Sequence, residues 1–138
     1  MNEGEAKARF AEASVARLAT ADADGRPHVV PVVFVVHGDT IHSGVDEKPK
    51  RHSHLKRLRN IAANPTVTIL VDHYEDDWEK VWWVRADGQA RIAEDENELD
   101  TIRRELTSKY PQYVELDLEI GGAIAIDVDR WSWWSYRS

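Results

Sequence analysis

The fold is indicated most clearly by residues 17–36, which read RLATADADGRPHVVPVVFVV. Two apolar runs, 15–21 and 28–36, flank the polar segment DADGR. This order is typical of two strands joined by a turn, and Gly25 can adopt the positive φ that such a turn often needs. The dense valines of 28–36 predict a strand buried on both faces, and Pro31 places that strand at a sheet edge or a bulge.

The rest of the chain adds more strands and three helices. Strands are expected at residues 40–45, 67–71, 78–93, 114–120 and 123–128, and the aromatic segment 131–136 closes the chain. The 78–93 segment should bend near Asp87-Gly88. The strand expected at 114–120 should end at Gly121-Gly122. Helices are expected at 3–13, 53–63 and 96–110. The last of these helices is the clearest, because apolar residues recur at helical spacing at Leu99, Ile102, Leu106 and Tyr110.

The fold class follows from the count of elements. Six to eight strands, mostly joined by tight turns, predict a mainly β fold. We expect an antiparallel barrel with about three peripheral helices, formed by residues 1–138 as a single domain.

Composition narrows the classes of protein that remain. The chain has 138 residues, of which 42% are hydrophobic and 31% charged, as in an ordinary globular protein. It has no cysteine, which excludes disulfides and thiol chemistry. The first ten residues lack the apolar core of a signal peptide, and the apolar run Val29–Val36 is too short to span a bilayer. We therefore expect a cytoplasmic protein.

Charge is distributed unevenly along the chain. Residues 48–59, KPKRHSHLKRLR, contain six basic residues and no acidic one. The whole chain has a formal net charge of −7, so the residues outside this stretch of +6 have a net charge of −13. This acidity argues against nucleic acid as a partner. The basic residues surround the start of the helix expected at 53–63, whose free N–H groups also attract anions. The stretch therefore predicts a phosphate or carboxylate site, and a solvated helix face is the alternative.

Other types of site have little support in the sequence. None of the six histidines has the spacing of a known zinc site, so no metal is expected, although His37 and His42 could face each other across a hairpin. Neither a GxSxG nor a GxGxxG motif occurs. Six tryptophans suit a core, a dimer interface or a planar ligand; they are Trp78, Trp82, Trp83, Trp131, Trp133 and Trp134.

Four segments together carry a resemblance to a known family. They are residues 17–36 and, further along the chain, KRLRNIAANPTVTILVDHY at 56–74, VWWVRADGQARI at 81–92 and IAIDVDRWSWW at 124–134. In this order and spacing they resemble the pyridoxamine 5'-phosphate oxidase-like family of split β-barrels, which bind flavin mononucleotide (FMN). More narrowly, the chain resembles its actinobacterial branch of oxidoreductases that depend on the deazaflavin coenzyme F420.

The resemblance implies a homodimer with two cofactor sites at the subunit interface. By this resemblance the cofactor ring would lie along His28, Val29, Val30 and Pro31 and be flanked by Ser43, Gly44 and Val45. Its phosphate would be held by the basic residues Lys48, Lys50, Arg51, Lys56 and Arg57. Asn60 stands where the family usually has an asparagine, and Arg57 stands where it often has a lysine.

The function that the resemblance implies is hydride transfer between F420 and a small electron-poor organic substrate. The alternatives are an FMN-binding flavin reductase, an oxidase-like protein, or a non-catalytic carrier of flavin or haem. A haem ligand could be His28 or His73. Arg85, Tyr74 and the tryptophans are candidates for the substrate side, and no catalytic side chain is assigned. A flat apolar slot followed by a basic cradle suits either flavin, and six basic residues suit the glutamate-bearing tail of F420 better than a single phosphate.

Overall fold

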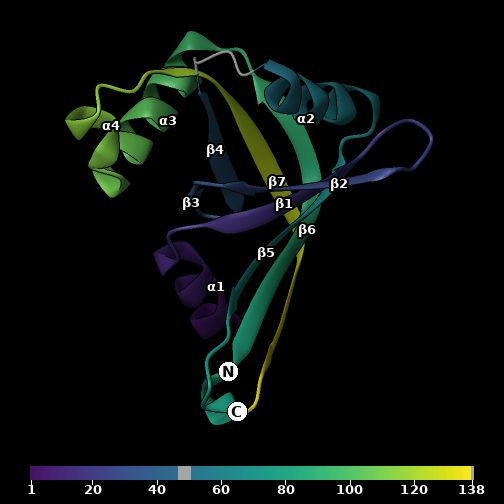
Figure 1. Ribbon diagram of the computed structural model, residues 1–138, viewed down its shortest axis with the longest axis vertical. Helices are drawn as coiled ribbons and strands as arrows, with labels where there is room; N and C mark the ends of the chain where they lie inside the picture. The colour runs from purple at the N-terminus through teal and green to yellow at the C-terminus, as the bar shows by residue number, and fades with distance from the viewer. Residues whose placement is uncertain (47–50, 138) are drawn as a thin grey trace.

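The computed structural model of the protein describes residues 1–46 and 51–137. Its elements follow in the order α1 (Glu3–Glu12), β1 (Ala16–Ala21), β2 (Pro27–Val32), β3 (Val35–His37), β4 (Thr40–Asp46), α2 (Arg51–Ala63), β5 (Thr66–His73), η1 (Trp78–Lys80), β6 (Trp82–Ala93), α3 (Glu96–Lys109), α4 (Gln112–Glu115) and β7 (Ile120–Ser135). The seven strands form one antiparallel sheet with helices around it (Figure 1). The expected mainly β fold with peripheral helices is confirmed.

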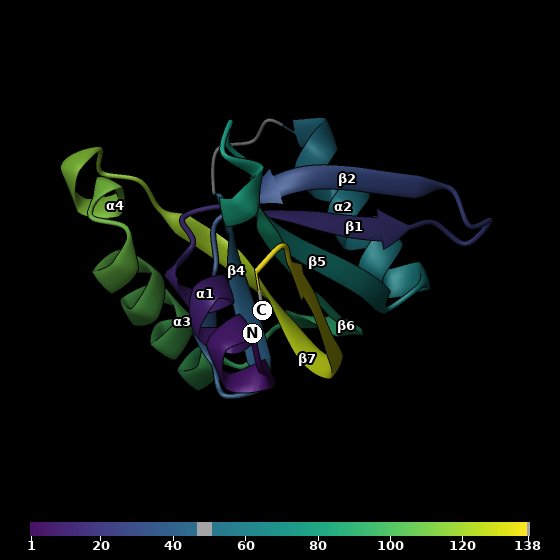
Figure 2. The same cartoon turned by 90° about the horizontal axis from the view of Figure 1, so that it is seen from below.

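The sheet is rolled up because of the way two of its strands are connected. The strand order is β2-β1-β5-β6-β7-β4-β3, so β2 and β3 lie at opposite ends. Laid flat, these ends would stand roughly 29 Å apart, at about 4.8 Å per strand spacing. In the chain, only Val33 and Phe34 separate the two strands, and this link spans at most roughly 11 Å. The sheet must therefore curve until its ends meet, as Figure 2 shows from below.

The valine-rich segment 28–36 is not the single strand that its composition predicts. The chain turns a corner at Val33-Phe34, which divides the segment between β2 and β3. Burial on both faces was also a wrong prediction, since Val29 points outward with 60% of its surface exposed. Pro31 does lie in a strand at the end of the sheet, as expected, because β2 pairs only with β1.

Two segments near the C-terminus also differ from expectation. Residues 114–120 do not form a strand; they contain the end of α4 and a turn in which Asp117 has a φ of 52°. Gly121 and Gly122 lie inside β7 rather than ending a strand. By contrast, the predicted bend at Asp87-Gly88 is confirmed as a register shift in β6, where a Cβ on Gly88 would overlap the backbone of Asp127.

The core lies inside the curved sheet and under the helices. α1 buries Phe10, whose ring centre lies 5.1 Å from that of Phe34 and 5.3 Å from that of Trp131. α3 buries Leu99, Ile102 and Leu106, as the helical spacing predicts. α2 contributes Ile61, which is 3% exposed.

The corner at Val33-Phe34 is held by three side chains, which we call the corner clasp: Ser43, Lys109 and Tyr110. The Tyr110 hydroxyl accepts a hydrogen bond from the Phe34 N–H (3.1 Å) and lies within donating distance of the carbonyls of Ser14 (2.9 Å) and Phe34 (3.1 Å). Lys109 Nζ donates to the carbonyls of Ala11 and Phe34, both at 3.0 Å. Ser43 Oγ donates to the carbonyl of Val33 (2.8 Å). The end of α3 is thus joined to the corner and to the end of α1.

One face of the sheet remains exposed, and we call it the open sheet face. Directly paired residues on β1, β5 and β6 alternate between Leu18, Ile69 and Ala86, which are fully buried, and Arg17, Leu70 and Arg85, which are not. The open sheet face continues onto β2 with Val29 and onto β7 with Trp134. It therefore combines apolar and charged side chains on the surface.

We expect removal of the Tyr110 hydroxyl to destabilise the fold. Tyr110→Phe leaves the buried Phe34 N–H without its acceptor, which should lower the free energy of unfolding by about 1–3 kcal/mol. Urea unfolding at neutral pH measures this change. The control is Tyr136→Phe, at a side chain that is 58% exposed, where a change within about 0.5 kcal/mol is expected. Equal stability of both variants would contradict the role of the clasp.

Candidate functional site

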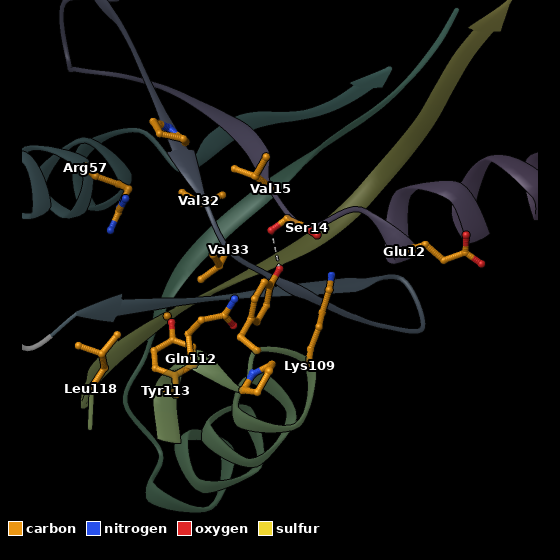
Figure 3. Close-up of a pocket in the computed structure, with 14 residues that line it drawn as sticks. Glu12, Ser14, Val15, Val32, Val33, Arg57, Lys109, Gln112, Tyr113 and Leu118 are labelled. Atoms are coloured by element: carbon orange, nitrogen blue, oxygen red, sulfur yellow. Dashed lines mark hydrogen bonds between the residues drawn. The ribbon is translucent and has the colours of Figure 1, made fainter. Parts of the chain in front are cut away.

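A cleft of about 690 Å³ opens beside the corner clasp. Its walls come from the connection between α1 and β1, the end of β2, β4, α2 and the corner between α3 and α4 (Figure 3). Pro31, Val32 and Val33 make one wall apolar, and Tyr113 and Leu118 add apolar surface opposite. The volume and the mixed lining are typical of a site for a small organic ligand.

Three of the residues implicated by the family resemblance line this cleft, each from a different element. They are Pro31 of β2, Gly44 of β4 and Arg57 of α2. A Cβ at Gly44 would come within 3.0 Å of Leu106 and 3.2 Å of Ile120, so a glycine lets α3 and β7 pack closely against the strand. Its neighbours Ser43 and Val45 are 1% and 9% exposed and belong to the protein interior.

β2 presents its residues in two directions. Val29 faces outward, whereas His28 pairs with the inward-facing Thr20. The Nδ1 atom of His28 is buried and has no hydrogen-bond partner among the residues that the structure describes. Because β2 is an end strand of the sheet, the backbone groups on its far side are not used in pairing with β1 and can bind a ligand edge.

α2 supplies positive charge to the cleft. It contains four basic residues and no acidic residue in the sequence RHSHLKRLRNIAA. Arg57 is only 7% exposed and reaches the cleft wall, and Lys56 beside it is half-buried. A guanidinium stays charged at any ordinary pH, so Arg57 places a permanent positive charge there. Lys48, Lys50 and the side chain of Arg51 lie outside the described residues.

Asn60 lies away from the cleft wall. Its side chain is 3% exposed and its Nδ2 atom donates to Thr20 Oγ1 at 3.0 Å. This hydrogen bond joins α2 to β1 inside the protein. Asn60 therefore fixes the position of the helix that carries Lys56 and Arg57.

The wall formed by α3 and α4 could not be found from the sequence. Lys109, Gln112 and Tyr113 line it, yet residues 114–120 were expected to form a strand. Tyr110 was expected only as a buried residue of the helical stripe. The nearest signal was Pro111, which marks the end of a helix but does not indicate where that end lies in the fold.

Burial changes the acid–base behaviour of the clasp. It lowers the pKa of Lys109 from 10.5 to about 8, and it raises the pKa of Tyr110 above its usual value. The Lys109 ammonium also lies 3.9 Å from the centre of the Phe34 ring, which is a favourable cation–π distance. Lys109 thus gives the cleft a second cation, at the end of the cleft that lies away from α2.

Other polar clusters lie outside the cleft. His37 and His42 face each other, as predicted, with ring centres 6.3 Å apart, and their Nδ1 atoms lie 3.0 and 3.3 Å from the two carboxylate oxygens of Glu105. Among the described residues, no group of three or more histidine, aspartate or glutamate side chains could hold a metal ion.

The tryptophans divide between the core and the surface. Trp82, Trp131 and Trp133 pack partly against the core, whereas Trp78 and Trp134 are 72% and 44% exposed. No helix in the described part of the chain is long and apolar enough to cross a membrane.

Comparison with known proteins places this geometry among proteins of one family. A family model described as pyridoxamine 5'-phosphate oxidase matches residues 3–134. A search of curated proteins gives no match.

Solved structures with the same fold cover nearly the whole chain. A haem storage protein from Vibrio cholerae is 21% identical, with a TM-score of 0.72 over 96% of this chain and 93% of its own. An FAD-binding protein from Mesorhizobium loti is 21% identical, with a TM-score of 0.74 over 96% and 94%. An FAD-binding protein from Mycobacterium smegmatis is 19% identical, with a TM-score of 0.69 over 100% and 99%.

The lowered pKa of Lys109 predicts a dependence of stability on pH. Between about pH 8 and 10.5 the unfolded chain binds more protons at this residue than the folded protein does, so its contribution to stability rises with pH. The difference in free energy of unfolding between wild type and Lys109→Met should therefore shift in favour of wild type across this range. Urea unfolding at several pH values measures it. Lys80→Met, at an exposed lysine, is measured in parallel as the control, and a flat difference at Lys109 would contradict the shift.

Proposed function

The chain belongs to the pyridoxamine 5'-phosphate oxidase family, and on this premise we propose that it is an oxidoreductase that uses the deazaflavin coenzyme F420. The proposed reaction transfers a hydride between this cofactor and a small electron-poor organic molecule. The observation that carries the proposal is the basic helix α2, which brings the buried Arg57 to the wall of an otherwise largely apolar cleft. The proposal keeps the cytoplasmic location expected from the sequence.

The residues of the cleft fit a planar ligand with a phosphorylated tail. Arg57 and Lys56 would hold the phosphate, because charge-assisted hydrogen bonds to phosphate are the strong ones. Pro31, Val32 and Val33 would lie against the ring, and the free edge of β2 would bind its polar rim. His28, whose Nδ1 atom is buried without a hydrogen-bond partner among the described residues, does not belong to the cleft wall and is left out of this set. When bound, the cofactor would supply the hydride chemistry, and the protein its position and electrostatics.

The amount of positive charge favours the deazaflavin over FMN. The tail of F420 ends in several glutamates, which add carboxylates to its phosphate. Six basic residues without an acidic one between residues 48 and 59 suit such a tail better than a single phosphate. FMN is the alternative cofactor, and the FAD-binding proteins of the same fold support the wider class of flavins.

A carrier that binds flavin or haem without turnover is the second candidate, and the haem storage protein of the same fold supports it. Of the two histidines considered as haem ligands, His73 is hydrogen-bonded to Glu75 and stacks on Trp82. His28 is the candidate with a buried ring nitrogen still available.

We include a homodimer in the proposal, with the open sheet face as its interface. Val29, Leu70 and Trp83 place apolar surface there, and aromatic and apolar side chains mixed with arginine are typical of interfaces. Pro31 lies in β2, which also borders the cleft, so the interface would run beside the cofactor. On this face the guanidinium group of Arg85 lies 5.2 Å from the centre of the Trp83 ring. Arg85 would therefore contact a substrate only if that substrate binds at the dimer interface.

Fluorescence titration with F420 and, separately, with FMN, FAD and haem tests the cofactor. We expect micromolar or tighter binding of F420 that weakens with salt. Replacing Lys50, Arg51, Lys56 and Arg57 with alanine should raise the Kd at least about 100-fold, since hydrogen bonds from charged groups contribute about 1.5–3 kcal/mol each. Residual binding should be less salt-sensitive, while circular dichroism shows an intact fold.

The matched control is Arg104→Ala, which removes a positive charge from the exposed side of α3 and should leave binding unchanged. Unchanged affinity in the α2 variant would refute the cradle. Preference for FMN, FAD or haem would support the alternatives. Oxidation of the reduced cofactor on addition of electron-poor substrates would separate an enzyme from a carrier.

A further inference from the structure

Lys109 lines the cleft as a cation without an acidic partner. Both printed-length hydrogen bonds of its Nζ atom, at 3.0 Å, go to main-chain carbonyls, those of Ala11 and Phe34. Among the residues that the structure describes, no carboxylate lies within ion-pair distance of this atom. Other cations of the chain do pair with carboxylates, among them Lys7, Arg91 and Arg103. The ammonium group in the cleft is thus held in place but not neutralised.

The lack of a counter-ion leaves a marked effect on this lysine. Burial alone lowers the pKa of Lys109 to about 8, because no acidic neighbour offsets the loss of water around the ammonium group. A carboxylate bound in the cleft would supply the missing counter-ion and favour the charged form. A cation of this kind in the wall of a cavity is typical of a site for an anionic ligand.

The apolar wall of the cleft separates its two cations. Figure 3 shows Arg57 on one side of Val32 and Val33 and Lys109 on the other. In the proposed function Arg57 holds the phosphate and the valines contact the ring, so Lys109 lies beyond the ring. The glutamates of F420 lie on the other side of the phosphate from its ring, so this tail would extend away from Lys109. The charge of Lys109 therefore remains for a second ligand.

The donors at this end of the cleft suit a carboxylate better than a phosphate. An ammonium group has three N–H donors, and two of those on Lys109 are used by the carbonyls of Ala11 and Phe34. The exposed amide of Gln112 in the same wall offers further N–H groups. These few donors match the two oxygens of a carboxylate, whereas a phosphate group presents more acceptor oxygens and more charge.

We propose that the substrate of this cleft carries a carboxylate group and that Lys109 binds it. The inference rests on the proposed function for the order of the ligands in the cleft. It deepens that function by naming the substrate class, a small electron-poor organic acid. Val33 and Leu118, which line the cleft on either side, would contact the apolar part of this acid.

The protonation of Lys109 sets the pH range in which the acid binds. The other groups in the cleft wall that carry charge or titrate are Glu12 of α1, Arg57 of α2, and Tyr110 and Tyr113 at the corner between α3 and α4. Arg57 stays charged at any ordinary pH, and burial raises the pKa of Tyr110. Binding that depends on Lys109 should therefore weaken as the pH rises through about 8.

Further titratable groups lie close to Lys109 outside the cleft wall. One turn earlier on α3, the carboxylate of Glu105 contacts the ring nitrogens of His37 on β3 and His42 on β4. A Lys109→Arg variant keeps all of these groups, so it separates their titration from that of Lys109.

Benzoate and its uncharged analogue benzamide test the site in the protein without cofactor. NMR titration of methyl-labelled protein gives the Kd and locates the ligand by the shifts of Val32, Val33 and Leu118. The benzoate Kd should rise about 5–10-fold from pH 7 to pH 9, because the charged fraction of a lysine with a pKa of about 8 falls from about 90% to about 10%. Benzamide should bind at least about 10-fold more weakly at pH 7.

Substitutions of Lys109 make this test specific. Lys109→Arg retains a cation that does not titrate, so benzoate should bind with a Kd that changes less than about twofold between pH 7 and pH 9. Lys109→Met should weaken benzoate binding at pH 7 at least about 10-fold. The control is Lys80→Met, at an exposed residue that does not line the cleft, which should bind benzoate as the wild type does.

The protein with F420 bound distinguishes two sources of a carboxylate at Lys109, the substrate and the glutamate tail of the cofactor. Benzoate should bind this complex with a Kd within about twofold of that without cofactor, since the two ligands occupy different parts of the cleft. Competition between F420 and benzoate would place Lys109 in the cofactor site and overturn the assignment to the substrate.

Two further results would overturn the proposal. An equal benzoate Kd at pH 7 and pH 9 in the wild type, or equal binding of benzamide and benzoate, would show that Lys109 holds no carboxylate. If the wild type binds no F420, the proposed function fails, and the benzoate titration without cofactor still decides whether Lys109 binds an organic acid.

Discussion

The structure depends on one short connection, the two residues between β2 and β3. Because these strands occupy opposite ends of a seven-stranded sheet, Val33 and Phe34 force the sheet to close on itself. Phe34 is fully buried, so its backbone groups need partners inside the protein. Tyr110 and Lys109 provide them from the end of α3. The need to satisfy a buried corner therefore fixes where α3 lies.

The cleft is a consequence of this closure. Once α3 is fixed at the corner, the residues after it form one wall, β2 forms another, and α2 contributes the charge. The position of α2 is set by the buried hydrogen bond between Asn60 and Thr20, so Arg57 is placed by an interaction that is not itself in the cleft. Cleft-lining groups on three separate elements are thus positioned by the packing of a single barrel.

The sequence predicts those features that depend on neighbouring residues. Apolar spacing located α3, a glycine after an aspartate located the bend in β6, and the run of basic residues located the charged wall of the cleft. The corner at Val33-Phe34 was missed because a continuous run of valines carries no local signal for a change of direction. That change is imposed by strands far away in the chain.

The segment 114–120 was misjudged for a related reason. Alternation of apolar and acidic residues is typical of a half-buried strand, yet Val114 and Leu116 are 70% and 65% exposed. Alternation alone does not show whether another strand is available for pairing. The wall formed by Lys109 and Tyr113 depends in turn on where this segment lies, so it could not be predicted before the fold was known.

The strand order has a consequence for how the chain folds during synthesis. β4 pairs with β3 and β7, and β7 is translated after the other six strands. The hairpin of β3 and β4 therefore cannot join the growing sheet until translation of the C-terminal strand is complete. Before β7 is made, β2, β1, β5 and β6 could already pair, while the hairpin would lack β7 as the strand that covers Ile41 and Val45. Barrel closure is thus a long-range step that waits for the last of the seven strands, and such non-local strand pairing is typical of slow folding.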